Sequence, residues 1–163
     1  MSAINAYSTA IDLDEEMLSC YANRAVCYLA LYMYSDCIDD CDEAARIILQ
    51  RNQKKDIGDH SVSDNQMLVK LYMRKATAKC QSGLFKDAIE AYDVALVFHN
   101  VVCAYYEDPS NSTAMTDLIK ADIGRIKSNI ENDIVKLRLL YDAEIIKLKA
   151  DGHIANGEVE EAH

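Results

Sequence analysis

Residues 21–28 read Tyr-Ala-Asn-Arg-Ala-Val-Cys-Tyr, and residues 70–76 read Lys-Leu-Tyr-Met-Arg-Lys-Ala. The tyrosine and alanine at positions 21 and 25 recur 51 positions later, at 72 and 76. An aromatic residue and an alanine four positions apart lie on one face of a helix, and the alanine lets a second helix approach closely. The two stretches therefore indicate one helical unit that occurs twice. Lys79 replaces Tyr28 in the second copy, and we expect its stem to lie along the helix with its charge in water.

A second helical pattern occurs three times, in residues 3–11, 37–45 and 88–96. Each copy begins with a small residue, followed four positions later by a second residue and three positions after that by an alanine. These three residues lie on one helical face. The first two copies are 34 residues apart, the period of a helix-turn-helix solenoid repeat, and the third follows the second by 51. We expect the small residues of both patterns to be buried at helix crossings, namely Ala25, Cys37, Cys41, Ala44, Ala76, Ala88 and Ala95.

The alternation of these patterns predicts an all-α solenoid of one half repeat plus two full repeats within residues 1–100. We expect helices near residues 3–13, 17–31, 35–50, 66–82 and 86–99. The extra residues of the longer interval, roughly 51–67, are polar and contain glycine, so a lengthened helix and a surface loop would absorb them. Because the chain starts at the second helix of its first unit, we expect Ile4, Tyr7 and Ile11 to face a helix that the chain does not encode.

The pattern changes after residue 100. A less regular link over residues 101–112 contains the only proline, Pro109. Residues 113–150 predict one long amphipathic helix, because an apolar stripe with an eleven-residue repeat stays on one side of a nearly straight helix. We expect its first turns to cap the third repeat, and the rest either to project towards a partner or to fold back on the solenoid. Residues 151–163 predict a disordered acidic tail. The stripe consists of Ile119, Ile123, Ile126, Ile130, Ile134, Leu137, Tyr141, Ile145 and Leu148.

Composition excludes several classes of function. The net charge is −10, which argues against nucleic acid and anionic membranes as partners because both require a basic surface. The longest apolar runs are too short for a membrane span, and the N-terminus lacks the form of a signal peptide. The sequence therefore predicts a soluble cytoplasmic protein.

The six cysteines form no C-x-x-C pair. Cys37 and Cys41 are one helical turn apart and could hold two metal ligands, but both occupy small-residue packing positions. We therefore expect buried reduced thiols, no metal and no cofactor. The histidines at 60, 99, 153 and 163 lie in loop-like or tail regions, and the sequence contains neither a glycine-rich phosphate loop nor a Ser/His/Asp grouping. We expect no catalytic residues and no enzymatic activity.

The units resemble tetratricopeptide repeats, and among these the C-terminal repeat domain of the dynein axonemal assembly factor family. The resemblance rests on residues 3–7, 21–27, 77–81 and 91–96 and on the long insertion before the third unit. It implies a non-enzymatic adaptor that works with Hsp90 or Hsp70 while axonemal dynein is preassembled in the cytoplasm. It also implies dynein assembly factors or dynein chains as partners, and an association with cilia or flagella.

The same helices carry residues suited to a peptide's terminal carboxylate. Lys70 and Arg74 are one helical turn apart, and Asn23 occupies the same place in its unit as Arg74 does in the later one. Two cations and a neutral amide can hold the paired carboxylates of an acidic Hsp70 or Hsp90 tail. Gln81, seven positions after Arg74, could add a donor. Related clamps take two further residues from a preceding helix, so we expect weak binding.

Two alternatives remain at this stage. Lys70 and Arg74 could be merely solvated charges on an exposed helix face. The chain could also be a structural scaffold subunit that binds no chaperone, with Ile119–Leu148 pairing with a partner helix or with a second copy of itself.

Overall fold

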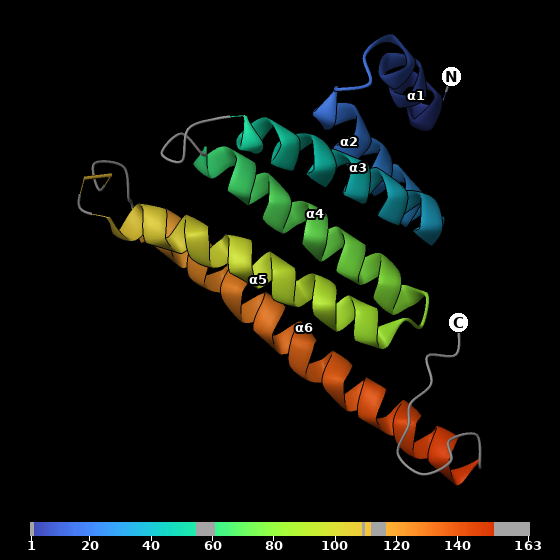
Figure 1. Ribbon diagram of the computed structural model, residues 1–163. Helices are drawn as coiled ribbons and strands as arrows, with labels where there is room; N and C mark the ends of the chain where they lie inside the picture. Colours follow the sequence, from blue (N-terminus) through green and yellow to red (C-terminus); the bar gives the residue numbers. More distant parts are fainter. Residues whose placement is uncertain (1, 55–60, 109, 112–116, 152–163) are drawn as a thin grey trace.

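The structure, a computed structural model, describes residues 2–54, 61–108, 110–111 and 117–151. Within these ranges the chain is helical and contains no strand. Figure 1 shows the helices stacked in chain order, each beside its predecessor, with α6 running along α5 at one edge of the molecule. The helices are α1 (Ala3–Leu13), α2 (Leu18–Ala30), α3 (Tyr34–Gln53), α4 (Val62–Gln81), α5 (Phe85–Glu107) and α6 (Asp117–Ala150). The predicted all-α solenoid is confirmed.

Small side chains occupy the helix crossings, as predicted. All seven of the alanines and cysteines expected there are at most 1% exposed, and all six cysteines are free thiols. Larger side chains such as Ile48, Leu68 and Leu71 fill the space beside them and are also fully buried. The spacing of small residues in the sequence therefore sets how the helices stack.

The extra residues between the second and third units are mostly taken up by longer helices. α3 continues to Gln53 and α4 begins at Val62, capped by the side chain of Ser61. α5 likewise continues to Glu107, which corrects the start of the irregular link expected at residues 101–112. Residues 100–107 contain neither glycine nor proline, and the added turns bury Val102. The expected loop at 55–60 and the tail beyond Asp151 lie outside the described residues.

An ion pair joins the first three helices. Arg24 of α2 donates to Asp40 of α3 through Nε at 2.8 Å and Nη2 at 2.7 Å, and through Nη1 to Ser8 Oγ of α1 at 2.8 Å. Its guanidinium also lies over the rings of Tyr21 and Tyr28. Because both charged side chains are largely buried, this contact fixes the relative orientation of all three helices.

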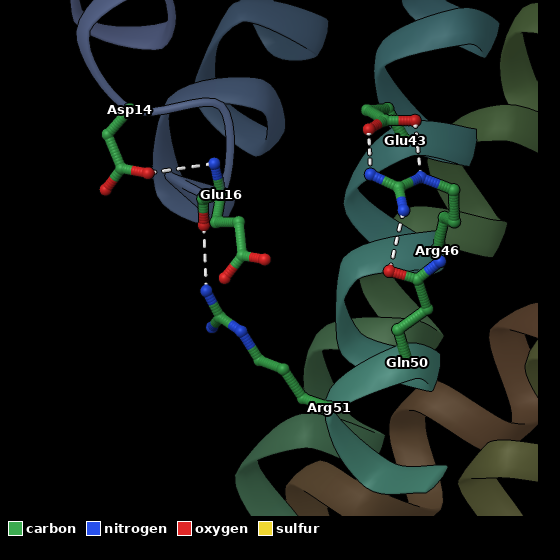
Figure 2. Close-up of polar contacts among 6 residues, drawn as sticks. All are labelled: Asp14, Glu16, Glu43, Arg46, Gln50 and Arg51. Carbon is green, nitrogen blue, oxygen red and sulfur yellow. Dashed lines mark hydrogen bonds and ion pairs between the residues drawn. The ribbon is translucent and has the colours of Figure 1, made fainter. Parts of the chain in front are cut away.

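The loop between α1 and α2 is held by one hydrogen bond from α3 and one within the loop (Figure 2). Arg51 Nη2 donates to the backbone oxygen of Glu16 at 2.8 Å, while Asp14 Oδ1 accepts from the Glu16 amide at 2.9 Å. α1 also packs against α2, with Ile11 inside the core and Tyr7 beside it. The expectation that both residues face a helix missing from the chain is therefore wrong, because α2 itself covers them.

The long C-terminal helix folds back on the solenoid. All nine residues of the predicted stripe are buried or half-buried, and Ile126, Ile130, Ile134 and Leu137 pack into the core formed with α4 and α5. Further along, Leu148 lines a groove that also contains Phe85, at the first turn of α5. The stripe Ile119–Leu148 is thus directed towards the solenoid, which agrees with the alternative that the helix folds back and not with the alternative that the stripe projects towards a partner helix.

The small-residue crossings give a first prediction. Replacing Ala76, which is fully buried, by leucine should lower the free energy of unfolding by roughly 1–3 kcal/mol, because the extra methylenes overpack the crossing of α4 and α5. Urea denaturation measures this change. Ala121→Leu, at an exposed position of α6, is the matched control and should change stability little. Equal effects of the two variants would contradict the assigned crossing.

The turn between α2 and α3 and the turn between α4 and α5 give a second prediction. Tyr32 has φ 61 and Gly83, 51 positions later, has φ 79, so a tyrosine adopts the left-handed conformation that favours glycine. Tyr32→Gly should stabilise the protein by about 1 kcal/mol, since this conformation costs a non-glycine residue about that much. Gly83→Ala should destabilise it similarly, although a Cβ atom there meets nothing within 4 Å. Thermal denaturation of both variants tests this, and the same sign for both would contradict it.

Candidate functional site

Arg74 reaches from α4 to α2, beside Asn23. Its Nη1 donates to the backbone oxygen of Ala22 at 3.0 Å, which places the guanidinium one residue away from Asn23, itself exposed on α2. This hydrogen bond uses one of five N–H donors of the guanidinium. The remaining donors can bind a carboxylate in a bidentate manner.

Lys70 lies one turn before Arg74 on α4 and is exposed. Residues four apart on a helix are separated by about 6 Å along its axis, so the ammonium and the guanidinium can reach one acidic group together. Lys70 forms no ion pair with any residue that the structure describes. The structure thus places Arg74 in contact with α2 at the residue before Asn23, with Lys70 one turn away from Arg74 on α4.

Gln81 lies apart from these three residues. It is the last residue of α4 and is exposed. Seven residues of helix separate it from Arg74 by about 10 Å along the axis. A carboxylate held between Lys70 and Arg74 is therefore out of its reach, and only a more distant part of the same peptide could contact it.

Most other cations of α2 and α4 are neutralised within the protein. Arg24 pairs with Asp40, Lys75 Nζ lies 2.5 Å from Asp42 Oδ1, and Lys79 Nζ lies 3.1 Å from Asp87 Oδ2. The expectation that Lys79 holds its charge in water is wrong, because Asp87 at the start of α5 meets it across the turn. Sequence reasoning missed these pairs, since each joins residues on different helices.

A cavity of about 590 Å³ opens beside Lys70, between α4, α5 and α6. Its walls are mostly apolar, and Lys70 and Asp122 are the charged residues among its lining residues in the described part of the chain. The others are Gln66, Val69, Met73, His99, Val102, Tyr106, Leu118, Ile119, Ile123 and Ile126. The sequence gave no indication of this cavity, because three helices must meet to form it.

His99 forms part of the cavity wall and is 2% exposed. Its Nδ1 lies 3.3 Å from Cys103 Sγ, while its Nε2 has no hydrogen-bond partner among the described residues. Burial lowers the pKa of His99, and the positive charge of Lys127 acts in the same direction. The Ile123 backbone and the negative charge of Glu131 raise this pKa, but their effect is smaller. The expectation that His99 lies in a loop-like region is wrong, because α5 continues past it.

The cysteines behave as packing residues. The hydrogen bond with Cys37 is the main cause that raises the pKa of the Cys41 thiol, and burial is the second. The positive charge of Arg74 lowers this pKa, but by less, so the thiol stays protonated at neutral pH. The described residues contain no group of three or more His, Cys, Asp or Glu placed to hold a metal ion. None of the described helices is long and apolar enough to cross a membrane.

The paired helices, their small-residue crossings and the recurrence of one unit define a tetratricopeptide-repeat-like α-solenoid. The curated proteins similar to this chain include Hsp70-Hsp90 organizing proteins and dynein axonemal assembly factors. Hsp70-Hsp90 organizing protein 1 of Arabidopsis thaliana is 37% identical over 103 residues, 60% of this chain and 16% of the relative. Dynein axonemal assembly factor 4 of Pan troglodytes is 29% identical over 137 residues, 83% of this chain and 27% of the relative.

The chain thus spans about a quarter or less of the length of these curated relatives. Hsp70-Hsp90 organizing protein 1 of Glycine max is similar to the same extent, at 36% identity over 100 residues. No family model matches the chain, and no solved structure is significantly similar to it.

The buried histidine gives a third prediction. The unfolded chain takes up a proton at this imidazole near the ordinary pKa of 6.5, whereas the folded chain resists protonation. The free energy of unfolding should therefore fall as the pH drops through this value, because the unfolded state binds more protons. Urea denaturation at a series of pH values should show a shallower fall for His99→Leu than for the unaltered chain. Parallel curves would contradict the assignment.

Proposed function

We propose that this chain is a non-enzymatic adaptor that binds the acidic C-terminal tail of Hsp70 or Hsp90. Lys70 and Arg74 supply the cationic donors for the terminal carboxylates, and Asn23 supplies a neutral amide. Gln81 lies further along the same helix and contacts a more distant part of the peptide.

The observation that carries the proposal is the distribution of charge on α2 and α4. Arg24, Lys75 and Lys79 each have a carboxylate partner, whereas Lys70 and Arg74 have none among the described residues. In a chain of net charge −10, two adjacent cations without an acidic partner form a local positive site. The hydrogen bond to Ala22 holds the Arg74 guanidinium in place beside Asn23, which lowers the entropic cost of binding an anion.

The names of the relatives support the choice of ligand and setting. One relative is an Hsp70-Hsp90 organizing protein and another is a dynein axonemal assembly factor. We infer that this chain assists the cytoplasmic preassembly of axonemal dynein and binds dynein assembly factors or dynein chains. We also infer that it acts in cells that build cilia or flagella.

Peptide titration tests the proposed site. A peptide with the acidic chaperone sequence and a free C-terminal carboxylate should bind with micromolar or weaker affinity. Lys70→Ala and Arg74→Ala should each weaken binding about tenfold, which corresponds to about 1.4 kcal/mol, and Asn23→Ala should weaken it less. Raised salt should also weaken binding because the contacts are ionic. Isothermal titration calorimetry measures each effect.

Two controls make this titration specific. Lys75→Ala removes a cation from the same helix, but one that already pairs with Asp42, and should leave peptide affinity nearly unchanged. Amidating the peptide's C-terminus should abolish binding, since it deletes a charge that the site holds. If amidation does not weaken binding, or if the double variant Lys70→Ala/Arg74→Ala still binds the peptide, the site does not hold the peptide's terminal carboxylates.

A structural scaffold that binds no chaperone tail is the alternative. An apolar outer face on α6, formed by Val135, Leu139 and Ile146, favours it. The same titration separates the two functions, because a pure scaffold would bind neither the free nor the amidated peptide.

A further inference from the structure

The C-terminal half of α6 is apolar on two opposite faces. One face is the stripe that packs towards α5 and includes Ile134 and Leu137. The other face carries Val135, Leu139 and Ile146, which are 59%, 66% and 67% exposed. An α-helix advances 100° per residue, so these three side chains fall within about 40° of one another, on the side away from the solenoid. A helix that is apolar on both sides is usually covered on both.

A row of charges runs beside this outer face. Glu131, Arg138, Asp142 and Lys149 are spaced 7, 4 and 7 residues apart, so they lie in one line along the helix. All four are exposed, and none forms an ion pair with a residue that the structure describes. The order of signs along the row is minus, plus, minus, plus.

We propose that the outer face of α6 binds the same face of a second copy of the chain, with the two helices antiparallel. The charge row specifies this occupant. With the twofold axis level with position 140 along the helix, each residue lies opposite the one equally far on the other side of that position. Arg138 and Asp142 are each two residues from Leu140, and Glu131 and Lys149 are each nine residues from it. Every charge of the row therefore meets an opposite charge of the second copy.

The apolar residues fit the same register. Val135 of one copy comes within one residue of the position opposite Ile146 of the other, and Leu139, one residue from the axis, lies close to Leu139 of the second copy. A twofold interface uses the same surface on both chains, which requires a self-complementary pattern. A parallel pair would instead place the two rows at opposite edges of the interface, where these opposite charges cannot meet.

The contact is small, which sets its expected strength. Residues 131–150 extend about 30 Å along the helix, so we expect a buried area near the lower end of specific interfaces, about 1,200 Å² in total. Such an interface corresponds here to a dissociation constant of about 1–100 μM. Lys136 and Lys147 lie on the other margin of the face and limit the affinity further.

Sedimentation equilibrium of the full chain tests the pairing. The mass should rise from that of the monomer to twice that value across concentrations that bracket the expected dissociation constant. Leu139→Glu should keep the chain monomeric, because it places a charge in the centre of the face. Leu13→Glu alters a leucine of α1 that is 84% exposed and should leave the dimer intact. Circular dichroism checks that both variants remain folded. A chain that stays monomeric, or a dimer unaffected by Leu139→Glu, would overturn the proposal.

Charge reversal tests the register. Arg138→Asp and Asp142→Arg should each weaken the homodimer at least tenfold, because like charges then meet twice across the axis. An equimolar mixture of the two variants should form a heterodimer more stable than either homodimer, since every pair across the axis is then opposite in sign. An effect confined to each variant's own helix would not make the heterodimer more stable than the homodimers. If mixing gives no such increase in stability, the antiparallel register is wrong.

Discussion

The fold depends on small side chains at the helix crossings. Ala25, Cys41, Ala76 and Ala88 are at most 1% exposed because neighbouring helices can approach closely only where no larger side chain separates them. Since the same small residue recurs at the same place in each unit, the units also stack in the same orientation. This is why Asn23 and Arg74, 51 positions apart, come to face the same side of the solenoid. The proposed peptide site therefore depends on the packing register.

Ion pairs between helices determine which charges remain available. Arg24 is buried with Asp40 and Ser8, where its removal would leave an uncompensated carboxylate, so we assign it a structural role. Lys75 and Lys79 tie α4 to its two neighbours through Asp42 and Asp87. What remains on this surface is the pair Lys70 and Arg74, which have no acidic partner among the residues that the structure describes.

Local periodicity was sufficient to predict the helices, the crossings and the stripe of α6, because each depends on spacing within one segment. It failed where residues from different segments meet. His99 stands alone in the sequence, and its burial becomes evident only when α6 covers α5. The pairing of Lys79 with Asp87 depends on the geometry of a turn. For the site, the sequence predicted the choice of Asn23, Lys70 and Arg74, but neither the bond to Ala22 nor the cavity beside Lys70.

The two faces of α6 have separate consequences. Its inner stripe closes the solenoid and forms one wall of the cavity beside Lys70, whereas the outer face of Val135, Leu139 and Ile146 points away from both. The proposed pairing through the outer face would therefore leave the proposed peptide sites of both copies open. Two weak sites held in one dimer bind a partner with two acidic tails much more tightly than either site alone, because the second contact becomes intramolecular. The proposed three-residue site, although weak, would then be compatible with stable binding of a partner that presents two acidic tails.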